Sequence, residues 1–323
     1  MTSRRLEVIS VCAVDFMARK KTKKNKKNAP SNPSDRAFSW YPGHMVKAKR
    51  ELEENLKLSD AVLLMLDARA PISTRHTDLE AILNQRSTPF VLILNKVDLA
   101  EPEQTARWRS YLSGQGHYVV EMNSLHGRGA GPLTSLLDKI NKDVNSKRKL
   151  KGLLPREPRL MVAGLPNSGK STLLNRLVGK NRFKAGKKPG LTRGAQWVKV
   201  ANQYQLLDTP GILYPRIEGE VALSVLAATS SVKRDVLPKE KVAQNLLRIL
   251  HERGRLLEFI PQFEEFDEDD WVDEPLLILT EVWGFFSRGD YGPTGSAFER
   301  LLNLLSSKKR PITWETVDQL EES

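Results

Sequence analysis

The sequence predicts an α/β domain with a mainly parallel six-stranded sheet, followed by a small all-helical domain. From residue 60 onward, short apolar runs alternate with helical stretches, which is typical of β/α units. After Pro215 the apolar residues recur at helical spacing instead. A chain of 323 residues suits about two such domains. We therefore expect a disordered basic arm at 1–37, the α/β domain at 38–215 and the helical domain at 216–323.

Short apolar runs mark the expected strands, and longer periodic runs mark the expected helices. The strands are Val62–Leu66, Phe90–Leu94, Tyr118–Met122, Leu160–Ala163, Gln196–Val200 and Gln205–Leu207. The C-terminal helices are Val221–Ala228, Val242–Leu250, Leu276–Phe286 and Phe298–Leu305. The segment Lys142–Pro158 is rich in Lys, Arg and Pro, so it is expected to be a surface connection within the α/β domain.

Composition excludes two classes of protein. No apolar run approaches the roughly 18 residues that span a bilayer, so integral membrane association is not expected. The single cysteine, Cys12, can form neither an intrachain disulfide nor a cysteine-based zinc site. This usage favours a reducing compartment and leaves oxygen atoms as the ligands of any metal.

Positive charge is concentrated in the first two thirds of the chain. Residues 1–37 carry ten basic and three acidic residues, and residues 38–215 carry 28 and 15. Residues 216–323 carry more acidic than basic residues, and eight of the acids lie in an expected loop from Glu264 to Glu274. Such asymmetry favours a polyanionic partner such as RNA, although solubility alone is the simpler alternative.

The N-terminus does not predict secretion. The apolar stretch that follows Arg4 and Arg5 ends at Asp15, and a lysine-rich run follows it instead of a cleavage site. We expect a cytoplasmic protein of bacterial type, with an organellar matrix as the less favoured alternative.

The segment Gly164–Ser171 reads GLPNSGKS and fits the phosphate-binding pattern G-x-x-x-x-G-K-S between an apolar strand and a helix. Backbone N–H groups of such a loop surround a β-phosphate, Lys170 reaches the β- and γ-phosphates, and Ser171 ligates Mg²⁺. The alternative is an ordinary glycine-rich turn. The expected nucleotide-binding residues here are Pro166, Asn167, Ser168, Gly169, Lys170, Ser171 and Thr172.

Two further segments complete the expected phosphate site. Asp208-Thr209-Pro210-Gly211 follows an apolar strand, so Asp208 is placed to hold a Mg²⁺-bound water and the Gly211 N–H to meet a γ-phosphate. Thr192 lies in a basic loop and is the candidate for a second hydroxyl ligand of Mg²⁺. Taken alone, each segment is also typical of a common turn or loop.

Asn95-Lys96-Val97-Asp98 places the pattern N-K-x-D at the end of a predicted strand, where α/β sheets bind ligands. The Asp98 carboxylate can accept hydrogen bonds from guanine N1–H and the 2-amino group, whereas adenine lacks both donors. Lys96 would cover one face of the base, and Asn123 and Ser124 would complete the pocket. A strand followed by a capped helix is the simpler alternative.

These motifs are similar to those of GTPases, but their order is permuted because the base motif precedes the phosphate loop. With Trp40–Met45 (WYPGHM) and Asp67–Pro71 (DARAP), the chain closely resembles the circularly permuted RbgA (YlqF) family of ribosome-assembly GTPases over about residues 38–310. The resemblance implies GTP and GDP as ligands, Mg²⁺ as the cofactor, and the large ribosomal subunit precursor with its rRNA as the partner. We also expect a monomer.

The resemblance has implications for three residues. Ile212 stands where many GTPases carry a water-orienting glutamine, so hydrolysis without a partner should be slow, on the order of 10⁻⁴ to 10⁻³ per second. His44 of the WYPGHM motif is the implied catalytic residue that positions the water. Asn167 resembles the residue that marks K⁺-dependent GTPases.

Three functions compete at this point. The first is an RNA-contacting GTPase switch in large-subunit assembly, in which the Asp208–Gly211 switch passes nucleotide state into the helical domain that follows it. The second is a GTP-dependent interaction module with little hydrolysis. The third is a metabolic phosphotransferase, which Asn95, Lys96 and Asp98 argue against.

Overall fold

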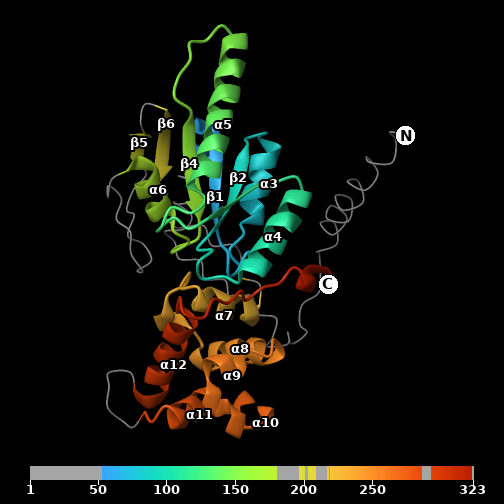
Figure 1. Cartoon of the computed structure of the whole chain (residues 1–323). Coiled ribbons are helices and arrows are strands. Elements are labelled where there is room, and N and C mark those ends of the chain that lie inside the picture. Colours follow the sequence, from blue (N-terminus) through green and yellow to red (C-terminus); the bar gives the residue numbers. More distant parts are fainter. Residues whose placement is uncertain are drawn as a thin grey trace, which may run out of the picture. The chain divides into compact units, whose positions relative to one another are not determined.

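The computed structural model describes residues 53–179, 196–200, 203–208, 217, 219–285 and 292–321. All of them lie in one compact unit, 37–323. Six strands form one sheet in the order β3-β2-β1-β4-β6-β5 (Figure 1). They are β1 (Ala61–Asp67), β2 (Phe90–Asn95), β3 (Tyr118–Met122), β4 (Arg159–Gly164), β5 (Gln196–Val200) and β6 (Tyr204–Asp208). All six strands predicted from the sequence are present.

The sheet is parallel except at one edge. β1 and β4 lie side by side in the middle, and β1 pairs with β2 and β4 pairs with β6 in parallel. β5 pairs with β6 antiparallel. Only residues 201–203 join these two strands, and so short a connection cannot make the crossover that a parallel pair needs. The prediction of a mainly parallel sheet is confirmed.

Helices cover both faces of the sheet. On one face, buried Leu79 and Trp108 of two helices pack against Leu64 of β1. On the other, Leu137 and Leu173 of two more helices pack against Leu63. These four helices are α3 (Thr77–Gln85), α4 (Pro102–Gly114), α5 (Ala130–Leu150) and α6 (Lys170–Val178). Alternate residues of β1 therefore enter different cores, which explains why the whole strand is buried and apolar up to Asp67.

Helix α5 corrects one prediction. The basic segment from Lys142 was expected to be a surface connection, but α5 continues through it to Leu150. Leu133, Leu137 and Ile140 recur at helical spacing and are buried. The basic residues of the last turn suit a helix C-terminus, where the macrodipole favours cations. The many charged residues therefore made the helical spacing of the apolar residues hard to recognise in the sequence.

The residues after β6 build a second core from helices. The four helices expected there are confirmed as α7 (Glu220–Ala228), α8 (Lys239–Glu252), α11 (Pro275–Val282) and α12 (Gly292–Leu305). Four shorter elements were not predicted, because each is too short to show the periodic spacing of apolar residues that marks a helix. They are α9 (Leu256–Phe259), α10 (Glu268–Val272) and the 3₁₀ turns η2 (Arg234–Val236) and η3 (Pro261–Glu265).

The acidic segment from Glu264 to Glu274 is not the loop that was expected. It contains the end of η3 and all of α10. Asp267 and Asp270 form a capping box at the start of α10, and Trp271 of this helix is buried in the helical core. Two of the acids therefore start a helix that supplies an aromatic anchor.

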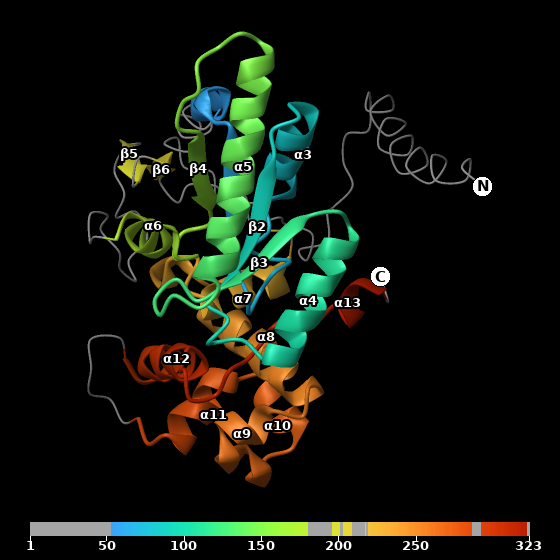
Figure 2. The same cartoon turned by 45° about the horizontal axis from the view of Figure 1, so that its top comes forward.

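Residues 311–317, called here the C-terminal strap, return from the helical core to the α/β domain (Figure 2). The side chain of Trp314 is buried in the helical core, while its backbone N–H donates to the carbonyl of Arg69 at 2.7 Å. Val317 packs into the core beneath α3 and α4. The strap ends at α13 (Asp318–Glu321), where Asp318 pairs with Arg107 of α4. The strap thus joins the two cores.

Glu315 fixes the strap to the loop that follows β1. Its carboxylate is buried and accepts hydrogen bonds from the N–H groups of Ile72 and Ser73 and from the Ser73 hydroxyl. Burial raises the pKa of Glu315 to about 7, although these donors act in the opposite direction. The carboxyl group therefore binds its proton more tightly in the folded than in the unfolded chain, where the ordinary value is 4.5.

This pKa difference predicts a pH-dependent stability. The raised pKa of Glu315 adds up to about 3 kcal/mol to the free energy of unfolding. This stabilisation is fully present below pH 4.5 and is lost as the pH rises to about 7. In Glu315→Gln the amide does not titrate, so the wild type should lose free energy of unfolding relative to this variant across that interval. Denaturant unfolding at several pH values measures the difference. A constant difference would contradict the prediction.

Candidate nucleotide-binding site

The predicted phosphate-loop and base-motif residues that the structure describes meet at the edge of the sheet where the parallel strands end. Asp67 of β1 lies opposite Asn95 of β2, and Met65 of β1 lies opposite Gly164 of β4. Met122, the last residue of β3, lies beside Asn95. The loops that leave these strands carry the phosphate motif, the base motif and Ser124. A permuted chain therefore brings the motifs to one edge, which is where open α/β sheets bind ligands.

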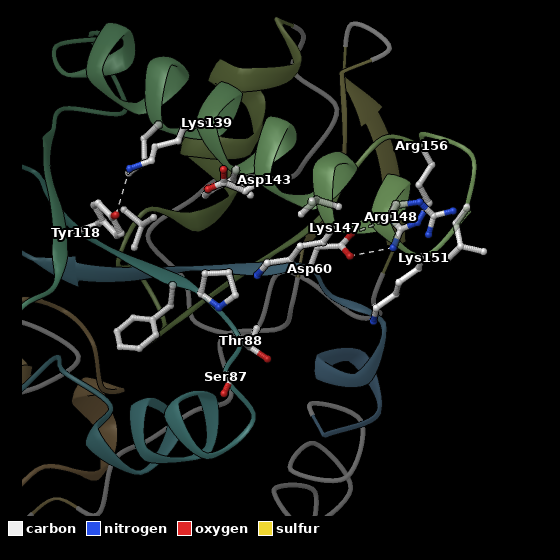
Figure 3. Close-up of a pocket in the computed structure, with 17 residues that line it drawn as sticks. Asp60, Ser87, Thr88, Tyr118, Lys139, Asp143, Lys147, Arg148, Lys151 and Arg156 are labelled. Atoms are coloured by element: carbon white, nitrogen blue, oxygen red, sulfur yellow. Dashed lines mark hydrogen bonds and ion pairs between the residues drawn. The ribbon is translucent and has the colours of Figure 1, made fainter.

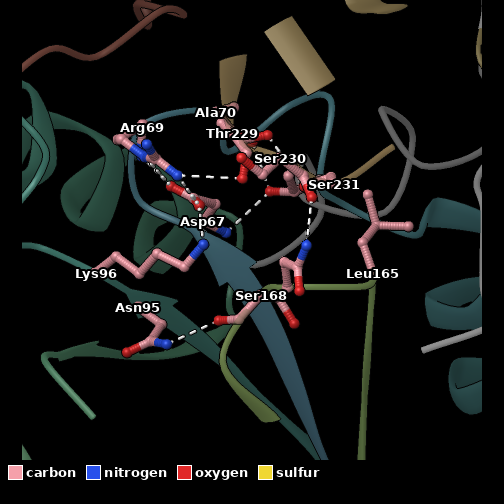
Figure 4. Close-up of polar contacts among 12 residues, drawn as sticks. Asp67, Arg69, Ala70, Asn95, Lys96, Leu165, Ser168, Thr229, Ser230 and Ser231 are labelled. Atoms are coloured by element: carbon pink, nitrogen blue, oxygen red, sulfur yellow. Dashed lines mark hydrogen bonds and ion pairs between the residues drawn. The ribbon is translucent and has the colours of Figure 1, made fainter. Parts of the chain in front are cut away.

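The side chain of Asn95 joins the base motif to the phosphate loop. Its Nδ2 donates to the carbonyl oxygen of Ser168 at 2.7 Å (Figure 4). Its Oδ1 accepts from the N–H of Ser124 at 3.1 Å and from its hydroxyl at 2.8 Å. All three residues are buried. One amide thus holds together segments that are 29 and 73 residues away from it in sequence.

Two glycines allow this close packing. A Cβ at Gly169 would lie 2.1 Å from Asn95 Nδ2, and the φ of Gly169 is +101°. A Cβ at Gly164 would lie 2.6 Å from the carbonyl oxygen of Met65. Any side chain at either position would push the phosphate loop away from β1 and β2. The glycines of the motif therefore serve packing in addition to the approach of a ligand.

The phosphate loop ends in the first turn of α6, which begins at Lys170. Ser171 and Thr172 also lie in this turn, whose N–H groups point away from the helix and suit a bound anion. Lys170 is buried, and its Nζ donates to the carbonyls of Gly164 at 3.1 Å and Leu165 at 2.9 Å. The ammonium therefore lies against the phosphate loop itself.

A buried charge cluster lies beside the base motif. Asp67 accepts two hydrogen bonds of 2.8 Å from the Arg69 guanidinium, and Lys96 Nζ lies 2.9 Å from its Oδ2 (Figure 4). Burial by itself would raise the pKa of Asp67, but the charges and hydrogen bonds of Arg69 and Lys96 outweigh it and hold that pKa far below its usual range. Asp67 is therefore ionised at neutral pH.

The turn that follows α7 touches this edge of the sheet. Asn167 of the phosphate loop donates through Nδ2 to the carbonyl of Ser230 at 2.5 Å, and Arg69 donates to the carbonyl of Thr229 at 3.4 Å (Figure 4). Leu165 and Ala70 are buried in the helical core. The helical domain therefore contacts the phosphate loop directly. This contact could not be foreseen from the sequence, because no local pattern in residues 229–231 indicates it.

Asp98 pairs with a lysine of the helical domain. Its Oδ2 lies 3.3 Å from Lys308 Nζ, which also lies 3.3 Å from His126 Nε2. Asn123, expected in the base pocket, accepts through Oδ1 from the N–H groups of Leu125 and His126 and shapes the loop that carries Ser124. Lys308 is far from the base motif in sequence, and the fold brings it there.

The structure does not address every predicted site residue. His44, Thr192 and Gly211 lie outside the described residues, and so do Ile212 and the link into α7. Asp208 ends β6 opposite Val162 of β4, next to the strand that leads into the phosphate loop.

Two of the residues predicted to help hold a magnesium ion lie on neighbouring elements. The Ser171 hydroxyl lies in the first turn of α6, and β6 ends at Asp208 beside β4. Within the described residues, no group of three or more His, Cys, Asp and Glu side chains could hold a metal ion. The hydroxyl of Ser171 is an oxygen donor of the kind that Mg²⁺ prefers.

The fold and the site define a P-loop GTPase domain with a circularly permuted order of motifs. The family described as 50S ribosome-binding GTPase matches residues 159–278. "Ribosome biogenesis GTPase A" of Bacillus pumilus is 43% identical over 66% of this chain and 75% of the relative. The protein of the same name in Bacillus cereus is 38% identical over 88% and 95%.

The chain therefore belongs to the ribosome biogenesis GTPase A family. A solved structure of YlqF from Thermotoga maritima with GNP bound shares the fold, with a TM-score of 0.56 and 24% identity over 84% of this chain and 98% of that one. The resemblance found in the motifs is thus confirmed, and the metabolic phosphotransferase is excluded.

Replacement of Asp98 should change which base is bound. In Asp98→Asn the amide cannot accept from both guanine donors, but its NH₂ can donate to the carbonyl that xanthine carries at C2. We expect GTP affinity to fall by roughly two orders of magnitude and XTP to bind better than GTP. Titration with labelled, non-hydrolysable analogues of GTP and XTP measures both affinities.

Lys308→Ala is the matched control for this test. An exposed ion pair is worth about 0 to 1 kcal/mol, so GTP affinity should change less than about fivefold. If Asp98→Asn still preferred GTP, the base would have to be read elsewhere.

Proposed function

We propose that this GTPase assists the maturation of the large ribosomal subunit as an RNA-contacting switch. The single observation that carries the proposal is the Asn95 bridge, because it joins a guanine-reading motif to a phosphate loop that also touches the helical domain. The names of the relatives support a role in ribosome biogenesis, and the family description supports the large subunit as the partner.

In the proposed reaction, water attacks the γ-phosphate of GTP and releases GDP and phosphate. Lys170 and the first-turn N–H groups of α6 would hold the phosphates, and Asp98 would hold the guanine. Ser171, Thr192 and Asp208 would hold Mg²⁺, which supplies charge neutralisation on the phosphates. His44 would position the water, because Ile212 can neither donate nor accept a hydrogen bond through its side chain.

Nucleotide state would reach the helical domain by two routes. One is the covalent link from Asp208 to α7. The other is the pair of contacts from Asn167 and Arg69 to the turn after α7. A γ-phosphate bound at the loop changes the surroundings of Asn167, so the turn is placed to respond.

We also propose where the protein acts and in which oligomeric state. Among the described residues, no helix is long and apolar enough to cross a membrane. The relatives in Bacillus pumilus and Bacillus cereus favour the bacterial cytoplasm as the site of action. The protein would act as a monomer on the subunit precursor and its rRNA.

Sedimentation with purified large subunits tests this function. We expect co-sedimentation with a non-hydrolysable GTP analogue, little with GDP, and stimulation of GTP turnover by the particles. His44→Ala should keep nearly unchanged GTP affinity while stimulated turnover falls by about 10²- to 10⁴-fold. Small ribosomal subunits serve as the control particle.

Two outcomes would overturn parts of this proposal. Binding that does not depend on nucleotide, without stimulated turnover, would favour the interaction module with little hydrolysis. Unchanged turnover in His44→Ala would remove the catalytic assignment.

The ion requirement gives a separate prediction. Asn167 in the phosphate loop would place its side-chain oxygen near a K⁺ ion that stabilises charge between the phosphates. Turnover should then be at least about tenfold faster in KCl than in NaCl of equal concentration, and Asn167→Ala should remove the difference. Equal rates in the two salts would exclude the potassium site.

A further inference from the structure

A groove opens at the edge of the sheet opposite the nucleotide site (Figure 3). Its floor includes Phe90 and Val91 at the start of β2 and Tyr118 at the start of β3, and one face of α5 forms its wall. The volume is about 490 Å³. Because these residues begin strands whose far ends carry the site motifs, a ligand here would not compete with GTP.

The groove carries an excess of positive charge. Lys139, Lys147, Arg148 and Lys151 line it from α5 and its C-cap. Two acidic residues, Asp60 and Asp143, also line the groove. Asp60 is neutralised by Arg156, whose guanidinium lies 2.7 Å from its carboxylate, so Asp143 is the acid that still offsets the positive charge. No ion pair within the described part of the chain engages Lys147 or Lys151, and both are exposed. Their charges are therefore open to an external anion.

An aromatic surface lies among these cations. Tyr118 is 52% exposed, and Lys139 lies over its ring at 5.3 Å from the centroid (Figure 3). Lys139 also donates to the Tyr118 hydroxyl at 3.3 Å. Leu153, 49% exposed, also lines the groove. A flat ring beside lysines is the combination that binds unpaired nucleic acid, because bases stack on the ring while phosphates pair with the lysines.

We propose that this groove binds a single-stranded segment of RNA. Lys147, Arg148 and Lys151 neutralise its phosphates, and Tyr118 stacks against one base. The charge favours RNA over an apolar peptide, whose burial would leave the rim cations desolvated without a partner. That the RNA is ribosomal rests on the proposed function. The groove would thereby hold the assembly intermediate at a surface remote from GTP.

Helix α5 offers a matched pair of variants for the test. Lys147→Ala/Lys151→Ala removes two charges from the groove. Lys142→Ala/Lys149→Ala removes two charges from exposed positions of the same helix that do not line it. Both variants have the same net charge, and thermal unfolding shows whether both remain folded. None of the four lysines belongs to the nucleotide site, so GTP affinity and unstimulated turnover should not change.

The direct probe is a fluorescent oligouridylate of about 12 nucleotides, titrated at several salt concentrations. The groove variant should bind at least about tenfold more weakly and lose about 1.4 from the slope of log K against log salt, as two lost phosphate contacts require. Tyr118→Ala should weaken binding at least fivefold. The control variant should stay within about twofold. Equal losses in the two lysine variants, or none, would overturn the proposal.

Two further measurements separate this proposal from others. If polyglutamate binding depended on Lys147 and Lys151 more than oligouridylate binding does, an acidic peptide would be the occupant and the RNA proposal would be wrong. Stimulation by large subunits reports on the proposed function: if the wild type is not stimulated, that function fails, while the oligouridylate titration still decides the groove.

Discussion

The site depends on the amide of Asn95, which uses both its donor and its acceptor to join three segments. In a permuted chain these segments are held by different covalent connections, so their relative positions rest on tertiary contacts at the strand ends. The amide is buried, and loss of either partner would leave a buried polar group unsatisfied at a cost of about 1 to 3 kcal/mol. The absence of a side chain at Gly169 is part of the same constraint, because a Cβ there would occupy the position of the Asn95 nitrogen.

The charge cluster at Asp67 extends this constraint to the loop after β1. An isolated buried carboxylate is costly, but Asp67 is engaged by both Arg69 and Lys96. Removal of one cation would leave Asp67 paired with the other, whereas removal of Asp67 would leave the charges of Arg69 and Lys96 side by side beneath the base motif without their anion. Since Arg69 also reaches Thr229, the conformation of this loop is tied to the helical domain as well as to the nucleotide edge.

Sequence patterns predicted the sheet better than the contacts between domains. All six strands were predictable, because short stretches rich in apolar residues recur along the α/β domain, although β3, β5 and β6 also carry Glu121, Lys199 and Gln205. The gathering of Asn95, Ser124 and Ser168 at one edge followed from their places after parallel strands. The continuation of α5 to Leu150 was missed because Lys142–Lys149 hid its apolar spacing. The roles of Ser230, Lys308 and Glu315 could not be foreseen, because each depends on a partner more than 60 residues away.

The helical domain is attached to the α/β domain by contacts of unequal strength. At the strap side, Glu101 of the α/β domain pairs with Arg253 at 2.7 Å and Arg255 at 2.8 Å, and it accepts from the N–H of Thr313. At the phosphate-loop side, the hydrogen bond from Asn167 to Ser230 joins two neutral groups.

Charge-assisted hydrogen bonds are about twice as strong as neutral ones, and the strap adds the buried Trp314 and Val317. Breaking the contact at Ser230 should therefore cost less free energy than breaking the contacts of Glu101. We expect the helical domain to remain attached through the strap while its contact with the phosphate loop follows the nucleotide.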